Sequence, residues 1–154
     1  MPIRQYRSPP SVGPILGPTT VCKGKSGVVF SVPYQPGVTY NWSYSGSGVN
    51  IVSGQGTHSI TANFSMTASP GVLSVTVSNA SCSALSSKNI DILIPSWELF
   101  ILLCTYDASC AGYPLPPPSY PCTGDVEGNT APYAHCNSTD TIHCIGEWEC
   151  MCSP

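Results

Sequence analysis

The fold is constrained most by the stretch from Thr20 to Ile94, where short runs of β-branched and aromatic residues alternate with clusters of Gly, Pro, Asn and Ser. The runs recur at about 8–12 residues, which is the usual strand spacing of a β-sandwich. We predict strands at Thr20–Cys22, Val28–Val32, Val38–Tyr44, Asn50–Val52, Ser59–Phe64, Val72–Ser78 and Asn89–Ile94. Short strands in this number suit two facing antiparallel sheets.

Strict alternation along two of these strands predicts which of their faces is buried. In Val38–Tyr44 every second residue is apolar or aromatic, and the same holds for Leu73–Ser78. Successive side chains of a strand point to opposite faces of the sheet, so each strand has one buried face and one face in water. The sequence therefore predicts an all-β protein built around a sandwich.

The segments on either side of this stretch differ from it in composition. Residues 1–19 are rich in proline, which favours an extended backbone and excludes a helix. After Ile94 the chain becomes rich in Cys and Pro, and Tyr113–Pro121 is predicted to form polyproline II. We therefore predict an extended arm at 1–19, a sandwich at 20–95 and a disulfide-rich, mostly irregular tail at 96–154.

Charged residues are scarce. They make up 8% of the chain, with 5 basic and 8 acidic side chains, whereas a typical soluble domain has about 25%. No basic face is available to neutralise a phosphate backbone, so we expect no nucleic-acid partner. No stretch reaches the roughly 18 apolar residues of a transmembrane helix, so we expect no membrane span.

The chain has nine cysteines. Disulfides persist in oxidising compartments and are rare in the reduced cytosol. We therefore expect an extracellular or cell-surface location, with most cysteines in disulfides.

The segment Gly17–Gly24 resembles the opening of PKD-like domains, which are immunoglobulin-like sandwiches of secreted surface proteins in Bacteroidetes-type bacteria. The resemblance continues through Val28–Pro33, Tyr40–Ser43, Gly54–Phe64 and Val72–Cys82, and it covers residues 15–94. It implies a β-sandwich that serves as a spacer, adhesion or carbohydrate-contact module and has no catalytic residues.

The same resemblance implies a disulfide between Cys22 and Cys82. Closing a loop of about 60 residues would stabilise the fold by roughly 4 kcal/mol in the chain-entropy model. Seven of the nine cysteines then remain, and the sequence leaves their connectivity open: Cys104, Cys110, Cys122, Cys136, Cys144, Cys150 and Cys152. An odd number cannot pair within one chain, so one thiol is either free or bridges two subunits.

Metal binding is the alternative reading of the tail, because His135-Cys136, His143-Cys144 and Cys150-Met151-Cys152 supply imidazole and thiolate ligands. Structural zinc sites usually place two to four residues between paired ligands, and Cys150 and Cys152 are separated by one. His58 lies alone and is interpreted as a surface histidine. We therefore favour a disulfide framework and expect no metal and no cofactor.

The sequence shows no catalytic constellation. No serine lies in a nucleophile elbow, since Gly54-Gln55-Gly56 lacks the serine which that motif requires. The acidic pairs Asp125/Glu127 and Glu147/Glu149 are interpreted as surface carboxylates, without the Gly-containing loop of a calcium site. We expect that the protein is not an enzyme.

Several residues are candidate glycosylation sites, as expected for a glycoprotein. Asn41, Asn63, Asn79 and Asn137 each begin an Asn-x-Ser/Thr acceptor. Asp140-Thr141-Ile142 resembles the short O-glycosylation site of the same bacterial group, with Thr141 as the acceptor.

These features favour a non-enzymatic structural subunit of a surface filament or layer, whose partners are copies of itself or other surface proteins. The apolar run Leu99, Phe100, Ile101, Leu102 and Leu103 needs burial and is the candidate assembly segment. In this hypothesis, residues 1–19 or 97–104 add as a strand to an adjacent copy. The alternative is a carbohydrate-binding or adhesion module that contacts polysaccharide through Tyr34, Tyr44, Trp97 or Tyr113.

Overall fold

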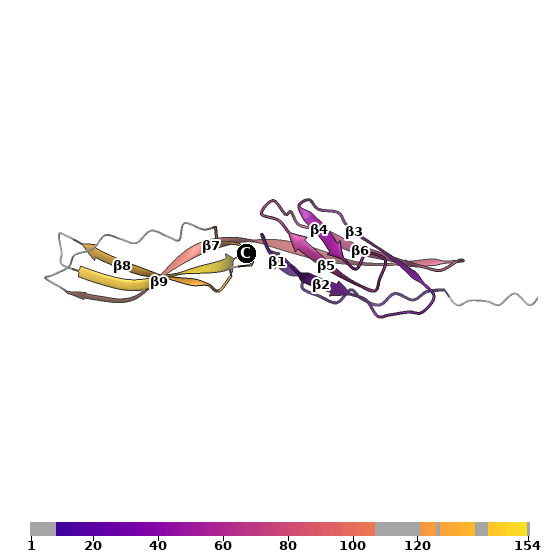
Figure 1. The fold of residues 1–154 in the computed structure, drawn as a ribbon, viewed down its shortest axis with the longest axis horizontal. Helices are drawn as coiled ribbons and strands as arrows, with labels where there is room; N and C mark the ends of the chain where they lie inside the picture. The colour runs from indigo at the N-terminus through magenta and orange to yellow at the C-terminus, as the bar shows by residue number, and fades with distance from the viewer. Residues whose placement is uncertain (1–8, 107–120, 126, 138–141, 154) are drawn as a thin grey trace, which may run out of the picture. The chain divides into compact units, whose positions relative to one another are not determined.

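A computed structural model describes residues 9–106, 121–125, 127–137 and 142–153, with side chains left undescribed at 101–106, 131–137, 142–146 and 153. The chain divides into two compact units, Met1–Ile92 and Leu93–Pro154, called here the sandwich unit and the C-terminal unit. Every regular element in the described residues is a β-strand (Figure 1). The all-β prediction is confirmed.

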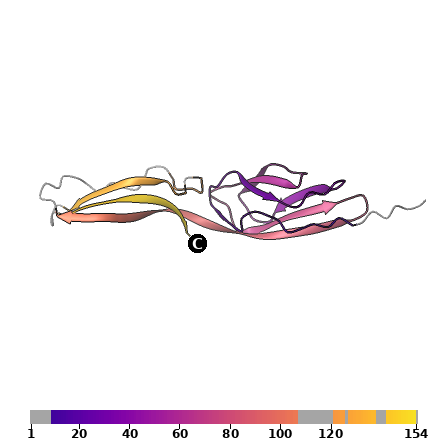
Figure 2. The same ribbon diagram turned by 90° about the horizontal axis from the view of Figure 1, so that it is seen from below.

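The sandwich unit is built from two sheets, seen as two layers in Figure 2. One sheet has the order β2-β5-β4, and the other joins β3, β6 and the first part of β7, with β1 also paired to β7. The strands are β1 (Thr20–Cys22), β2 (Val28–Ser31), β3 (Thr39–Tyr44), β4 (Val49–Ser53), β5 (Ser59–Phe64), β6 (Gly71–Ser78) and β7 (Ser83–Tyr106).

The predicted strands are all present, but the last one is far longer than expected. β7 begins at Ser83, not at Asn89, because Ser83–Ile90 pairs with β6 in an unbroken register. It then continues past Ile94, and Ile94–Tyr106 pairs with β9 in the C-terminal unit. One strand therefore contributes to both units.

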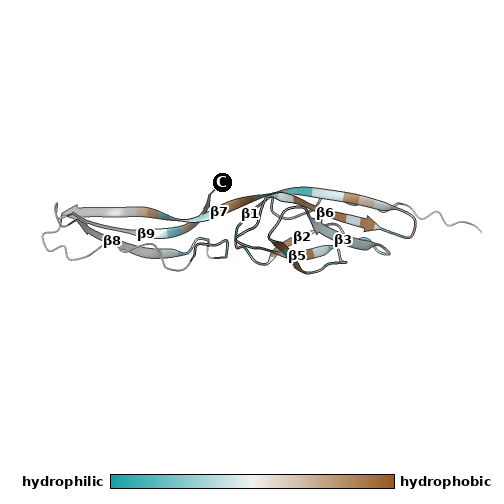
Figure 3. Ribbon diagram, turned by 90° about the horizontal axis from the view of Figure 1, so that it is seen from above, coloured by the Kyte–Doolittle hydropathy of each residue, from teal (hydrophilic) through white to brown (hydrophobic). Residues whose placement is uncertain are grey.

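The core of the sandwich lies where the alternation predicted it. In β5 every second residue is buried, and β6 buries Leu73, Val75 and Val77. Figure 3 shows hydrophobic stretches on β2, β5 and β6. Burying a side chain of this size contributes about 1.5–3 kcal/mol. The core residues are Ile15, Val21, Phe30, Val32, Tyr40, Trp42, Ile60, Ala62, Phe64, Ala68, Leu73, Val75, Val77 and Ile90.

The segment before β1 belongs to the sandwich, although residues 1–19 were expected to form an arm. Ile15 is 4% exposed and lies in the core. Leu16 exchanges two backbone hydrogen bonds with Ser31 of β2, at 2.7 and 3.1 Å. The carbonyl of Thr19 accepts from the amide of Asp91 in β7 at 2.8 Å. The segment thus contacts both sheets, while residues 1–8 lie outside the described residues.

The C-terminal unit contains a sheet in the order β7-β9-β8, with β8 at Thr130–Asn137 and β9 at Ile142–Ser153. The tail was expected to be mostly irregular. On one sheet face the register places Trp97 opposite Cys150 and Leu99 opposite Trp148. Cys150 is fully buried, and the two tryptophans are half-buried. These aromatic and cysteine side chains form the apolar face of the unit.

The expected assembly run lies inside β7. The backbone of Leu99–Leu103 pairs with β9 across a register shift between Ile101 and Leu103. Leu99 is half-buried and Phe100 is 41% exposed. The side chains of Ile101, Leu102 and Leu103 lie outside the described residues. We expected this run to be buried by a neighbouring copy, but its own sheet already covers part of it.

Candidate interaction site

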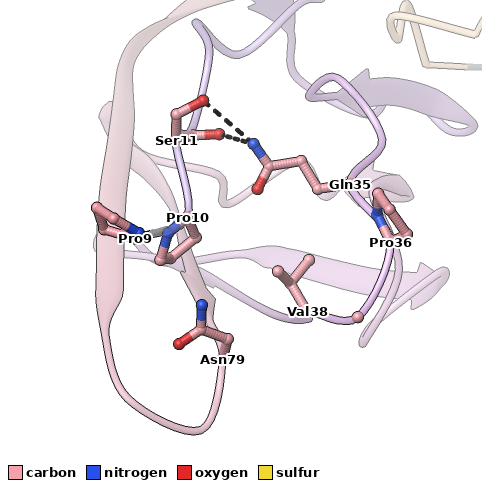
Figure 4. A pocket seen from close by; sticks show the side chains of 8 residues that line it. Pro9, Pro10, Ser11, Gln35, Pro36, Val38 and Asn79 are labelled. Atoms are coloured by element: carbon pink, nitrogen blue, oxygen red, sulfur yellow. Dashed lines mark hydrogen bonds between the residues drawn. The ribbon is translucent and has the colours of Figure 1, made fainter. Parts of the chain in front are cut away.

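A hollow lies at one end of the sandwich unit, between the segment before β1, the β2–β3 loop and the β6–β7 turn (Figure 4). The Gln35 side-chain amide donates to the backbone carbonyl of Ser11 and, at 3.2 Å, to the Ser11 hydroxyl. The backbone N–H of Gln35 donates to the Tyr40 hydroxyl at 2.7 Å. These bonds fix the loop over the buried ring of Tyr40. The lining residues are Pro9, Pro10, Ser11, Gln35, Pro36, Gly37, Val38 and Asn79.

An exposed aromatic ring lies in the same loop. Tyr34 is 67% exposed, and its ring meets the edge of His58 with centroids 5.5 Å apart. His58 also contacts Tyr40, at 6.4 Å. His58 was interpreted as a lone surface histidine, but it is half-buried between two tyrosines. Tyr34 and His58 together present a rigid aromatic surface that could contact the apolar face of a sugar ring.

The other aromatic candidates are less available. The Tyr44 ring packs on Phe64 at 6.0 Å, and its hydroxyl donates to the Ser69 carbonyl at 2.8 Å. Burial raises the pKa of the Tyr44 hydroxyl above 10.0, and the negative charge of Asp91 raises this pKa further. Trp97 is half-buried in the C-terminal unit, and Tyr113 lies outside the described residues.

The β6–β7 turn carries an exposed, unpaired cysteine, Cys82. The side-chain oxygen of Asn79 accepts from the backbone N–H groups of Ser81 and Cys82, each at 2.9 Å. The backbone N–H of Asn79 donates to the Cys82 carbonyl at 2.9 Å. This small asparagine-capped turn holds the thiol in solvent.

The disulfide implied between Cys22 and Cys82 is therefore wrong. Cys22 is disulfide-bonded to a different cysteine. Thr19, just before β1, bonds to Asp91, and nine extended residues separate Asp91 from Cys82, a span of roughly 30 Å. Cys22 lies only three residues from Thr19, a distance of at most about 10 Å. Cys22 and Cys82 therefore remain roughly 20 Å or more apart. A disulfide requires Cα atoms within about 7 Å.

One disulfide is fully described in the C-terminal unit. Cys122 and Cys150 are bonded, with Cα atoms 5.5 Å apart, and Cys152 is also disulfide-bonded. The side chains of Cys104, Cys136 and Cys144, and the whole of Cys110, lie outside the described residues. We expected the unpaired thiol in the tail, whereas the structure places one in the sandwich unit, at Cys82.

The acidic side chains of the C-terminal unit do not form a metal site in the described residues, where no group of three or more His, Cys, Asp or Glu could hold an ion. Glu98 lies directly opposite Glu149 in the β7–β9 register, and Phe100 lies opposite Glu147. Glu147 and Glu149 thus share the sheet face that lies opposite Cys150. The side chains of His135 and His143, and those of their neighbouring cysteines, lie outside the described residues.

The candidate glycosylation residues occupy different environments. Asn41 is exposed on β3. Asn63 is half-buried and accepts from the backbone N–H of Gly27 at 2.9 Å, whereas the Asn79 oxygen is used by its own turn. The Asn137 side chain and Thr141 lie outside the described residues. Asn41 is therefore the acceptor with the freest side chain among those described.

The outer face of the β3-β6-β7 sheet carries no charge across three successive rows. Cross-strand registers align its residues as Thr39/Ser78/Ser83, Asn41/Thr76/Leu85 and Ser43/Ser74/Ser87. Leu85 is 66% exposed at one edge of the middle row. The face is a flat array of small hydroxyl and amide groups with one exposed leucine.

The two facing sheets of short strands define an immunoglobulin-like module. A family model described as a PKD-like domain matches residues 8–92, which is more than half of the chain. The chain belongs to this family, and the resemblance inferred from its motifs is confirmed. No curated protein matches it.

The family and the disulfides indicate an extracellular module of a type that is usually non-catalytic. Within the described part of the chain, no helix has the length and apolar character of a membrane crossing.

Proposed function

We propose that this protein is a non-enzymatic structural subunit of an extracellular filament or layer, in which neighbouring copies cover the faces of the PKD-like sandwich. The observation that carries the proposal is the set of three successive uncharged rows on the outer face of the β3-β6-β7 sheet. Soluble monomers usually keep about 25–35% charged residues on their surface, with both signs interspersed. Three successive rows without charge are better suited to contact with protein than to isolation in water.

Exposed apolar side chains extend this pattern. Besides Leu85, Val29 and Val52 are 55% and 48% exposed on the other sheet. Scattered exposed apolar residues are normal on a monomer. Only 8% of the residues in this chain are charged, however, so few charged side chains surround these exposed apolar residues.

The contact mode differs from the donor arms that we first expected. Ile15 lies in its own core, and Ile94–Tyr106 pairs with β9 of its own chain. The described parts of both segments therefore pair or pack within their own chain. We therefore propose that copies meet through sheet faces and edges.

Sizing of the full chain over a range of concentrations, with and without reductant, tests the proposal. We expect higher-mass species that grow with concentration. Leu85→Lys should reduce their formation at least tenfold, because it places a charge on the contact face. Leu16→Lys is the matched control, since Leu16 is 57% exposed outside this face and should assemble like the wild type. A chain that stays monomeric throughout would contradict a structural subunit.

A carbohydrate-binding or adhesion module is the second candidate, and the exposed pair of Tyr34 and His58 beside the hollow supports it. Aromatic rings supply much of the contact area in ligand sites. Retention of the full chain on insoluble polysaccharides, lost in Tyr34→Ala and kept in Tyr34→Phe, would favour this function. Retention unchanged by Tyr34→Ala would count against it.

A further inference from the structure

Most edge strands of the two sheets in the sandwich unit are protected against pairing with another chain, each by a different contact. A strand edge with free N–H and C=O groups invites pairing with another chain, and proteins usually block it. β2 is closed by its two hydrogen bonds with Leu16. β7 pairs with β1 and carries the inward-facing Lys88, whose Nζ donates to the Ile15 carbonyl at 3.1 Å.

The β3 edge is closed by a side chain. The backbone N–H of Trp42 donates to Oε1 of Gln55 at 2.9 Å, and Nε2 of Gln55 donates to the Trp42 carbonyl at 2.8 Å. The amide thus occupies both outward backbone groups in the middle of β3, as a neighbouring strand would. The Trp42 indole N–H also donates to the Thr57 carbonyl at 2.8 Å, which fixes the same turn against the strand.

β4 has no comparable cover. The carbonyl of Gly48 accepts from the Ser65 N–H at 2.8 Å, so Gly48 and Asn50 direct their backbone groups toward β5. Backbone direction alternates along an antiparallel strand, so the N–H and C=O groups of Val49 and Ile51 point away from β5. Among the described residues, no partner meets these outward groups. β4 is the outer strand of its sheet, beyond β5 (Figure 1).

The chemistry of this edge suits a second copy of the same chain. From Ser45 to Phe64 the sequence contains no Asp, Glu, Lys or Arg and no proline. Two β4 strands can therefore approach without like-charge repulsion or missing donors. The outward residues Val49 and Ile51 lie symmetrically about Asn50, so antiparallel pairing around a two-fold axis matches Val49 of each copy with Ile51 of the other.

The β-bulge sets the length of this contact. The β4–β5 register shifts between Ile51 and Ser53, and a bulge bends its strand and interrupts pairing. The usable edge is therefore Val49–Ile51. Such a short contact is weak alone and becomes effective when other faces of the same subunits also meet.

We propose that β4 is the edge through which a second copy of this chain adds, antiparallel and centred on Asn50, to join two β2-β5-β4 sheets into one. This inference rests on the proposed structural function, and it names the surface through which copies pair.

A charge-swap experiment on the full chain tests the pairing. Asn50 is exposed, and in the proposed pair the two Asn50 side chains lie directly opposite each other. Asn50→Lys alone and Asn50→Asp alone should each weaken association at least tenfold, and an equimolar mixture of the two should restore it. Asn129→Lys, the same change at an exposed site in the C-terminal unit, is the matched control and should associate like the wild type.

Hydrogen exchange gives an independent readout. The amides of Val49 and Ile51 should exchange fast in dilute protein and become protected at concentrations where it associates. The Trp42 amide, bonded to Gln55, should be protected in both. If the wild type associates while the Asn50 variants do so equally well and the two amides stay unprotected, the β4 inference is overturned and the structural function stands. If the wild type never associates, both fail.

Discussion

Gly54 and Gly56 lie in the same turn, and replacing them tests two different effects of a side chain: backbone strain and steric clash. Both have positive φ, +82° and +89°, a conformation that costs a non-glycine residue about 1 kcal/mol. A Cβ at Gly54 would lie 2.0 Å from the Ser59 carbonyl oxygen, whereas a Cβ at Gly56 would meet no atom within 4 Å. We expect Gly56→Ala to lower the free energy of unfolding by about 1 kcal/mol and Gly54→Ala by roughly 3 kcal/mol or more. Urea titrations measure both, and equal losses would contradict the packing of this turn.

Tyr44 makes the stability of the sandwich sensitive to alkaline pH. Its pKa is raised by burial and by Asp91, so the folded state holds the phenolic proton more tightly than the unfolded state. Stability is therefore intact below pH 10.0 and falls as the pH rises through the folded-state pKa. Tyr44→Phe should cost about 1 kcal/mol at neutral pH through the lost bond to Ser69. The difference in stability between Tyr44→Phe and the wild type should shrink above pH 10.0. Thermal unfolding of both proteins across this pH range measures it, and a difference that stays constant would contradict the prediction.

At the scale of elements, the β7–β9 ladder contains an unfavourable pair. Glu98 and Glu149 lie directly opposite each other, and like charges in this position destabilise a sheet. Glu149→Lys should convert repulsion into attraction and stabilise the C-terminal unit by about 0.5–1 kcal/mol at low salt. Glu127→Lys makes the same change in net charge at an exposed residue without such an opposite partner, and should have little effect. A gain in denaturant midpoint that persists at 1 M salt would exclude this electrostatic cause.

The elements of the sandwich could be predicted because one periodicity determined them. In β5 and β6, alternation alone identified the buried side chains. β9 carries the same kind of signal, since Trp148 and Cys150 alternate with Glu147 and Glu149, but its cysteines suggested an irregular tail. The bonds of the Gln55 side chain to the backbone of Trp42 could not be inferred from the sequence. The glycines that flank Gln55 indicate a turn, but they do not indicate which residue its side chain contacts.

At the scale of the whole molecule, local signals gave the family but not the long-range pairing. The disulfide between Cys22 and Cys82 came from the family resemblance and is wrong. Ser83–Lys88, which was not predicted as strand, extends β7 and separates Cys82 from Cys22. The proline-rich start was expected to be an arm, yet Ile15 reaches the core. Composition describes how stiff a segment is, and only tertiary contacts decide where it packs.

The same two-unit division predicts how the disulfides contribute to stability. Cys122 and Cys150 are 28 residues apart, so their bond stabilises the C-terminal unit by about 3–4 kcal/mol in the chain-entropy model. A unit of this size has little other stability to spare, since small domains bury limited apolar surface. The double variant Cys122→Ala/Cys150→Ala should therefore lose hydrogen-exchange protection along β9 while β5 stays protected.

Cys82→Ala is the matched control for that variant, because it removes an exposed thiol that forms no disulfide. It should leave the protection of both units unchanged and abolish labelling of the native chain by a maleimide at residue 82. Equal loss of protection in β5 and β9 after the double change would show that the two units unfold together. Because β7 runs through both units, this shared strand is one element that can couple their stability.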